Sequence, residues 1–139
     1  MNQKYRESIS KEIEAEKIDD LQASIGWQKR GNKKWKESLA KSFFVYSVWD
    51  NDKLIGMGRI LEDGTMCMFY DIMVHKDYQG KGIGKMIVKN LVNQIKNKDY
   101  HSINLFMDNE LLELFYGKFG FEPLGTGMRC KKYMKKYPK

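Results

Sequence analysis

Residues 74–86 constrain the fold of this chain more than any other segment. Three glycines at alternate positions, 80, 82 and 84, follow the apolar run 66–74 and lead directly into an amphipathic helical pattern. That pattern is carried by Ile83, Ile87, Leu91 and Ile95, which recur every four residues. The first four N–H groups of a helix lack internal partners, and the helix dipole adds partial positive charge there. The sequence therefore predicts a strand, a bare turn and a helix N-terminus that can hold a phosphate.

The segments before and after this turn predict a sheet with one parallel crossover. Residues 43–49, 54–61 and 66–74 are rich in apolar, aromatic and β-branched side chains and are separated by short polar turns, which indicates three antiparallel strands. Residues 102–107 alternate in strand fashion after the long helix, so they should lie parallel to the 66–74 strand.

The remaining elements are expected at both ends. We expect a strand at 5–10, a helix at 15–25 with Ile18, Leu21 and Ile25 on one face, and a loop at 28–36 that runs into a second helix. Near the C-terminus, a helix at 110–119 should bury Leu111, Leu112, Phe115 and Phe119 and end at Gly120, before a strand pair at 121–123 and 128–133. The order is β-α-α-β-β-β-α-β-α-β-β, an α+β fold.

Composition bounds the class of protein. A chain of 139 residues fits a single domain, 1–139, that can bury a hydrophobic core without the added stability of a metal or of disulfide bonds. It has no apolar run near the length of a membrane span and no visible signal peptide, so we expect a cytoplasmic protein. Cys67 and Cys130 are too few for a disulfide scaffold, and neither His75 nor His101 has ligand spacing, so we expect no metal.

The net charge of +7 favours a polyanionic partner, although such a charge also keeps small proteins in solution. Charge alone does not choose between cofactor phosphates and nucleic acid. The lysines at 131, 132, 135, 136 and 139 could form a nucleic-acid strip, but a solvated tail is the commoner outcome, so we expect no nucleic acid as partner.

Two common phosphate-binding motifs do not fit the glycine turn. A P-loop requires glycine where Gln79 stands and a hydroxyl residue where Met86 stands. The dinucleotide fingerprint G-x-G-x-x-G fails from either possible start, because its last glycine falls on Lys85 or its second on Ile83.

The remaining pattern, Gln79-x-x-Gly82-x-Gly84, resembles the pyrophosphate loop of the GNAT superfamily of N-acetyltransferases, [QR]-x-x-G-x-[GA]. A second block of that family is similar to Asn109-x-x-Leu112-x-x-Phe115-Tyr116-x-x-Phe119-Gly120-Phe121, with Leu112 in place of the usual small residue. The resemblance covers about residues 45–121 and implies a three-layer αβα fold around a mixed central sheet.

The resemblance also implies direct transfer of an acetyl group from acetyl-CoA to a primary amine of a small molecule. The expected catalytic residues are Tyr116, Asp71 and Val74, the last through its backbone N–H. The expected cofactor-binding residues are Met73, Val74, Gln79, Gly80, Lys81, Gly82, Ile83, Gly84, Lys85, Asn109 and Tyr116. An acyl-CoA-binding sensor without catalysis remains the alternative function.

The side chains leave several roles open. Asp71 could relay a proton from the amine, orient a substrate cation, or be a solvated strand residue. Tyr116 could protonate the leaving thiolate or simply pack beside Phe115, and Asn109 could contact the cofactor or cap a helix.

For the acceptor amine we expect a site formed by Trp27, Tyr70, Asp71 and Phe106, with Trp35 as a further aromatic wall. Core packing would explain the aromatic residues nearly as well. A homodimer is possible through strands near the C-terminus, which would offer an edge for pairing.

Overall fold

The structure is a computed structural model that describes residues 4–107 and 109–134. It divides into two compact units, residues 1–106 and 107–139, and each is described by itself.

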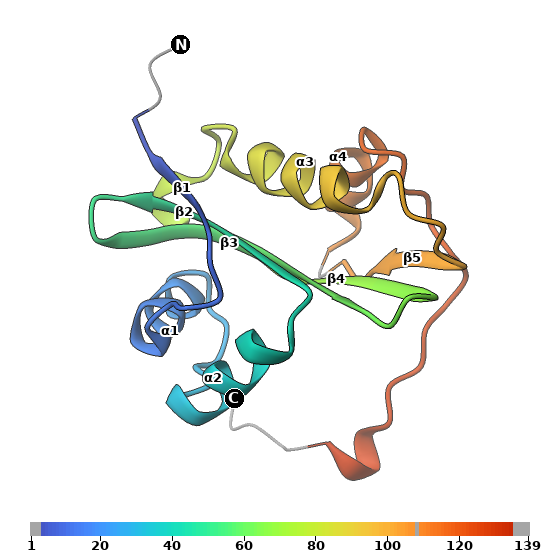
Figure 1. Ribbon diagram of the computed structural model, residues 1–139, viewed down its shortest axis with the longest axis horizontal. Coiled ribbons are helices and arrows are strands. Elements are labelled where there is room, and N and C mark those ends of the chain that lie inside the picture. The colour runs from blue at the N-terminus through green and yellow to red at the C-terminus, as the bar shows by residue number, and fades with distance from the viewer. Residues whose placement is uncertain (1–3, 108, 135–139) are drawn as a thin grey trace. The chain divides into compact units, whose positions relative to one another are not determined.

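The first unit is built on a five-stranded sheet in the order β1-β2-β3-β4-β5 (Figure 1). Neighbouring strands are antiparallel except β4 and β5, which are parallel. The strands are β1 (Arg6–Ile9), β2 (Phe44–Asp50), β3 (Lys53–Glu62), β4 (Met66–Val74) and β5 (Ser102–Leu105). The mixed sheet with one parallel crossover confirms the expected α+β fold.

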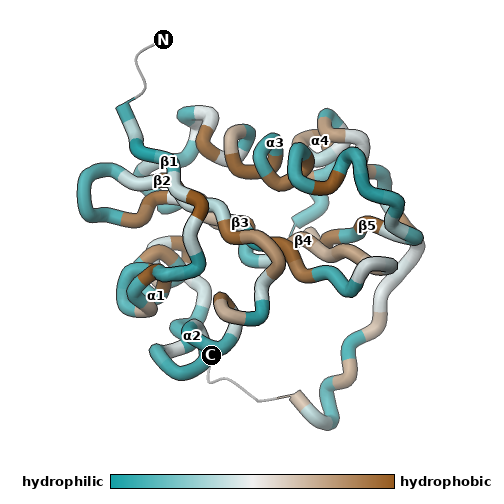
Figure 2. Tube along the Cα trace, in the orientation of Figure 1, coloured by the Kyte–Doolittle hydropathy of each residue, from teal (hydrophilic) through white to brown (hydrophobic). Residues whose placement is uncertain are grey.

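Helices cover both faces of this sheet. Helices α1 (Ala15–Ser24) and α2 (Asn32–Lys41) lie on one side of it, and α3 (Ile83–Ile95) crosses the other (Figure 1). The hydrophobic colour in Figure 2 follows β3 and the sheet-facing side of α3, as the four-residue repeat of isoleucine and leucine predicts. Ile83, Ile87 and Leu91 are at most 1% exposed.

Glycines in β3 set how closely α3 approaches the sheet. A Cβ atom at Gly58 would lie 2.7 Å from Cγ2 of Ile87 and 3.0 Å from Cδ1 of Leu91. A Cβ at Gly56 would lie 2.8 Å from Cγ2 of Ile83. The two glycines therefore act by leaving room for α3, which carries the predicted phosphate turn at its start.

The opposite face holds a second core under α1 and α2. Its fully buried members include Ile18, Leu21, Trp35, Met57 and Met73. Helix α2 begins at Asn32, inside the segment expected to be a loop, because Gly31 takes the positive φ of 89° from which the helix starts.

Strand β4 extends beyond the end of its parallel neighbour, β5, and contains a β-bulge. Pairing with β5 ends at Phe69 and Leu105, so the last five residues of β4 have no partner on that side among the described strands. On the other side the register with β3 shifts, because both Asp71 and Ile72 lie opposite Gly58. Asp71 takes a φ of 53°, a conformation that aspartate tolerates better than most residues.

The second unit differs from expectation in two places. The helix expected at 110–119 is a short 3₁₀ turn, η2 (Glu110–Leu112), followed by α4 (Glu113–Gly117). Leu111, expected to be buried, is 82% exposed. A 3₁₀-helix has about three residues per turn, fewer than an α-helix, so its side chains do not follow the α-helical face. Gly120 has the positive φ expected of a helix stop.

The prediction of a strand pair at 121–123 and 128–133 is wrong. This part of the described chain is irregular, apart from a 3₁₀ turn η3 (Lys131–Tyr133). Pro123 lacks an N–H for a strand ladder, and Leu124 and Met128 are exposed rather than alternately buried. The remaining lysines of the expected nucleic-acid strip, from position 135 on, lie outside the described residues.

In the part of the chain that the structure describes, no helix is long and apolar enough to cross a membrane.

We predict that Gly58→Val destabilises the protein, because the new side chain overlaps Ile87 and Leu91 and pushes α3 off the sheet. Overpacking of this kind costs about 1–3 kcal/mol of unfolding free energy, measurable by urea denaturation. Gly117→Ala is the control, since its Cβ meets nothing within 4 Å. Equal unfolding midpoints for Gly58→Val and the wild type would contradict the close approach.

Candidate active site

The free end of β4 presents a backbone N–H to open space. Gly56 and Val74 are register partners, and the N–H of His75 donates to the carbonyl of Ile55 at 2.8 Å. In an antiparallel ladder this bond makes Gly56 and Val74 a non-hydrogen-bonded pair, so both backbone groups of Val74 point away from β3. They point toward the side that β5 does not reach. Val74 can therefore donate a hydrogen bond to a ligand there.

The glycine turn starts α3 with bare amides. Gly80 and Gly82 have φ values of 78° and 84°, and a Cβ at either would meet nothing within 4 Å. Gly82 is the N-cap, and the first turn of α3 contains no acidic residue. The first bond that closes the helix comes from the N–H of Met86 to the carbonyl of Gly82, at 3.1 Å. The amides before it remain available to an anion.

Side chains tie the segment between β4 and α3 to the sheet. Gln79 donates from Nε2 to the carbonyl of Val74 at 3.1 Å, which links the turn to the free end of β4. The 3₁₀ turn η1 (Lys76–Tyr78) lies between them, and the Tyr78 hydroxyl donates to Asp50 at 2.6 Å. Nδ1 of His75 accepts from the N–H of Asp77 at 3.1 Å. Burial and then the charge of Lys53 lower the pKa of His75, so the neutral form that makes this bond is favoured.

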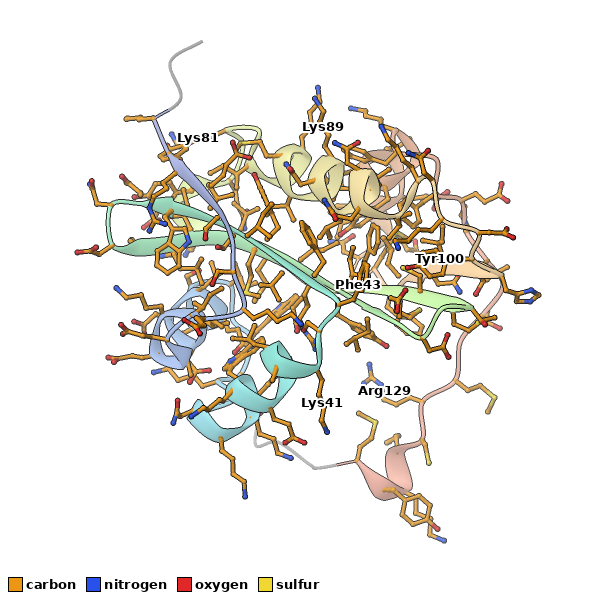
Figure 3. The ribbon with its side chains drawn as sticks, viewed as in Figure 1. Lys41, Phe43, Lys81, Lys89, Tyr100 and Arg129 are labelled. Carbon is orange, nitrogen blue, oxygen red and sulfur yellow. The ribbon has the colours of Figure 1, made fainter. Side chains whose placement is uncertain are left out.

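Lysines surround the glycine turn on its exposed side. Lys81, Lys85 and Lys89 are spaced four residues apart and all are exposed. Figure 3 shows Lys81 at the turn and Lys89 pointing away from the sheet on the outer side of α3. The arrangement adds positive charge where the helix dipole is already positive. Met73 and Ile83, by contrast, are 1% exposed, so their side chains pack in the core.

A buried ion cluster holds the bulge of β4 on the other face of the sheet. Arg30 donates from Nη1 and Nη2 to the two carboxylate oxygens of Asp71, at 3.1 and 3.0 Å. Arg59 donates from Nε to Oδ2 of Asp71 at 2.6 Å and from Nη1 to the Ser42 hydroxyl at 3.2 Å. The side chains of Asp71 and Arg59 are each 9% exposed, whereas that of Arg30 is 28% exposed.

The loop that carries Arg30 has its own anchor. The carboxylate of Asp19 accepts from the backbone N–H of Arg30 at 2.8 Å, from that of Gly31, and from the Trp35 indole at 3.0 Å. The Arg30 guanidinium stacks over the Trp35 ring with its Cζ 3.9 Å from the ring centroid. Trp35 is fully buried, so it supports the arginine and is not an open wall of an acceptor site.

Comparison with known proteins decides the family. The sequence profile of the acetyltransferase (GNAT) family matches residues 8–121, which is most of the chain. The chain belongs to the GNAT family. The match includes the glycine turn, the bulged strand and the second block around Tyr116.

Individual relatives agree with this assignment. An uncharacterized N-acetyltransferase, ycf52, of Pyropia yezoensis is 34% identical over 119 residues, which are 82% of this chain and 68% of that protein. The histone acetyltransferase TAP1 of Glycine max is 31% identical over 81% of this chain, but only 54% of that protein is covered. A probable acetyltransferase of Staphylococcus aureus has a similar structure, with a TM-score of 0.79 and 29% identity over 91% of this chain and 99% of that one. The chain is thus an N-acetyltransferase of the GNAT family.

The electrostatics of this GNAT chain change the interpretation of Asp71. Burial alone would raise the pKa of its carboxyl group, but the bonds and charges of Arg30, followed by those of Arg59, outweigh burial and lower it below the ordinary value. A carboxylate with a lowered pKa and both oxygens bonded to guanidinium groups is a poor proton acceptor. Two guanidinium groups already neutralise its charge, so it attracts a substrate ammonium group only weakly.

The other predicted residues are placed as follows. Trp27 and Tyr70 are half-buried and Phe106 is 74% exposed, and no ring contact joins these three among the described residues. Asn109 and Tyr116 belong to the second unit. There the side chain of Asn109 caps η2 by accepting from the N–H of Leu111 at 2.7 Å, and Tyr116 is 7% exposed beside Phe115.

Sequence reasoning missed Arg30 and Arg59. Arg59 had a usable signal, because a charged residue inside the apolar run 54–61 requires a buried partner of opposite charge. Arg30 had none, since it lies among lysines in a segment expected to be a solvated loop.

We predict that Asp71→Asn lowers the unfolding free energy at pH 7 by about 3–5 kcal/mol, because two guanidinium groups lose their counter-charge. The folded pKa of Asp71 is depressed, so its stabilisation is present above the unfolded value of about 3.9 and is lost as the pH falls through the folded value. The difference in unfolding free energy between wild type and variant should therefore become smaller at acidic pH, as measured by urea unfolding across pH. Glu37→Gln, at an exposed pair with Lys41, is the control. A gap that stays constant with pH would contradict the ion cluster.

Proposed function

We propose that this chain transfers an acetyl group from acetyl-CoA directly to a primary amine of a small molecule. The observation that carries the proposal is the free end of β4: the Val74 N–H points away from β3 and is linked through Gln79 to a glycine turn with bare helix amides. One end of this arrangement suits a diphosphate and the other suits a carbonyl oxygen.

The residues present fit acetyl-CoA, which would supply an activated acyl thioester. The amides of residues 80–85 and the charges of Lys81 and Lys85 would bind its diphosphate. The backbones of Met73 and Val74 would lie along its arm, with Val74 donating to the carbonyl oxygen. Gln79 would hold the turn and the strand end together. Asn109 and Tyr116, in the second unit, remain proposed contacts of the cofactor.

Each proposed catalytic residue has a distinct task. The Val74 N–H would stabilise the negative charge that develops on the carbonyl oxygen. Tyr116 would donate a proton to the departing thiolate. For Asp71 we propose positioning rather than proton transfer, because its oxygens are bonded to Arg30 and Arg59 and its pKa is lowered.

Direct transfer, without an acyl-enzyme, agrees with the state of Cys67. Burial, followed by the charge of Glu62, raises the pKa of this thiol to about 11, and its side chain is 1% exposed. Such a thiol is a weak nucleophile at neutral pH.

The acceptor is the least constrained part of the proposal. Trp27, Tyr70 and Phe106 are proposed to line the acceptor path. The name of the soybean relative, histone acetyltransferase, makes a protein lysine the second candidate acceptor. An acyl-CoA sensor without catalysis would bind the cofactor with no turnover.

A cytoplasmic location and a homodimer also remain predictions, and one relative from Arabidopsis thaliana is named as chloroplastic.

The proposal is tested by release of free thiol from acetyl-CoA in the presence of a panel of small amines and lysine peptides. We predict that Gly82→Asp weakens acetyl-CoA binding by about 100-fold or more, because the carboxylate would project beside the diphosphate. Gly64→Asp is a matched control, since Gly64 also has a positive φ, 92°, with nothing within 4 Å of its Cβ. Full acetyl-CoA affinity in Gly82→Asp would remove the turn from the site.

We predict that Tyr116→Phe lowers kcat by about 100-fold while acetyl-CoA affinity changes little, as expected for proton donation in the transition state. Phenylalanine preserves the ring contacts with Phe115 and Phe121, so packing is retained. The measurements are kcat from thiol release and the dissociation constant from calorimetry. Unchanged kcat would reduce Tyr116 to a packing residue, and tight binding without turnover in the wild type would favour the sensor.

A further inference from the structure

The geometry points to an acceptor that carries an anionic group, a carboxylate or a phosphate, close to its amine. This inference rests on the proposed function and narrows its substrate class. It starts from Asp71, the residue that was expected to attract a substrate cation. In the structure both oxygens of that carboxylate are already bonded to arginine, so the electrostatic preference of this surface is reversed.

One carboxylate faces two guanidinium groups at the bulge of β4. Arg30 and Arg59 together make three charge-assisted bonds to Asp71, none longer than 3.1 Å. The other carboxylate bonded to this loop belongs to Asp19. Its oxygens are occupied by the N–H groups of Arg30 and Gly31 and by the indole of Trp35, and it forms no ion pair among the described residues.

Unused donors of the two arginines reach the surface. A guanidinium group has five N–H donors, and the side chain of Arg59 spends only two of them, one on Asp71 and one on Ser42. Among the described residues, every fully buried side-chain nitrogen or oxygen has a partner. Nη2 of Arg59 has no bonded partner among the described residues, so this nitrogen is not fully buried, although the side chain as a whole is only 9% exposed. The guanidinium group of Arg30, whose side chain is 28% exposed, has further N–H donors that Asp71 does not use.

The segment around Arg30 adds several positive charges, of which the carboxylate of Asp19 offsets one. Residues 28–36 contain five basic side chains, at 29, 30, 33, 34 and 36, and no acidic one. Helix α2 starts directly after Arg30, with glycine at its N-cap and no acidic residue in its first turn. Its dipole therefore reinforces the arginines. A carboxylate or phosphate matches the planar, two-pronged donors of guanidinium groups better than any neutral group.

The location connects this anion site with the proposed chemistry. Asp71 and Val74 are three residues apart on the same strand. An amine whose anionic group binds at Arg30 and Arg59 would thus be held against the strand that carries Val74. Positive charge nearby also disfavours the ammonium form of that amine, so the neutral nucleophile needed for attack becomes easier to form. Polycationic acceptors such as lysine-rich peptides are repelled by the same surface.

The experiment compares matched amines that differ in one charge. The pairs are O-phosphoethanolamine with ethanolamine, and β-alanine with β-alaninamide, so the phosphate and the carboxylate are tested separately. For each amine, kcat/KM is measured by thiol release, and affinity for the protein loaded with CoA, which has no acetyl group to transfer, is measured by calorimetry at low and at high salt. We predict that at least one anionic member exceeds its neutral partner by about 10-fold or more in both measurements, and that salt reduces the difference.

Variants locate the effect. Arg30→Gln should bring the kcat/KM values of the two members of the preferred pair close to equality. Arg30→Lys should restore part of the difference, because lysine returns the positive charge but not the planar pair of donors. Arg6→Gln is the control. Arg6 lies in β1, at the opposite edge of the sheet from β5, and stacks on Trp49 of β2, so its loss should leave the preference intact.

The outcomes separate this inference from the proposed function. Thiol release with neutral or cationic amines at equal or higher efficiency would overturn the anion site while the acetyltransferase remains. Absence of any thiol release would count against the proposed catalysis. The calorimetry then decides the anion site by itself, because equal affinity for charged and neutral partners would overturn it. The wild-type comparison needs no variant, so a poorly folded Arg30→Gln would not affect it.

Discussion

The bond network at Asp71 is the interaction on which the described site depends. Strand β4 continues beyond the end of β5 and changes register with β3 at Asp71 and Ile72. A left-handed residue costs roughly 1–3 kcal/mol, and such a conformation persists only when its surroundings hold it. Here Arg30 and Arg59 hold it from two different elements, the α1–α2 loop and β3. The bulge and the free strand end are thereby kept in a defined relation.

This network also separates two differently charged surfaces of one strand. On the α3 side, the turn after β4 offers backbone amides to a phosphate, and the lysines at 81 and 85 supplement them. On the α1 and α2 side, the same strand carries Asp71 under a pair of arginines. Val74 lies where both regions approach the unpaired edge. In the proposed function, the acyl donor and the acceptor would reach this backbone N–H from separate directions.

Local pattern predicted most of the first unit because each element buries one regular face. The isoleucine and leucine repeat of α3 follows the helical period, the apolar runs of β2 and β3 are buried along most of their length, and β4 has the expected bounds. The same logic failed at 121–133, where Pro123 and exposed apolar residues do not form strands. It failed at Leu111 because the helical period was assumed where a tighter 3₁₀ turn occurs.

The sequence by itself determined the family and the glycine turn at the start of α3, because glycines that leave amides bare and a neighbouring glutamine are local features with a local physical cause. Only the tertiary structure decided the charge around Asp71. Arg30, Arg59 and Asp71 are separated by 29 and 12 residues along the chain (59 minus 30, and 71 minus 59), and no periodicity links them. Their pairing arises when the α1–α2 loop packs over the bulge, which converts a carboxylate expected to attract cations into the counter-ion of two arginines.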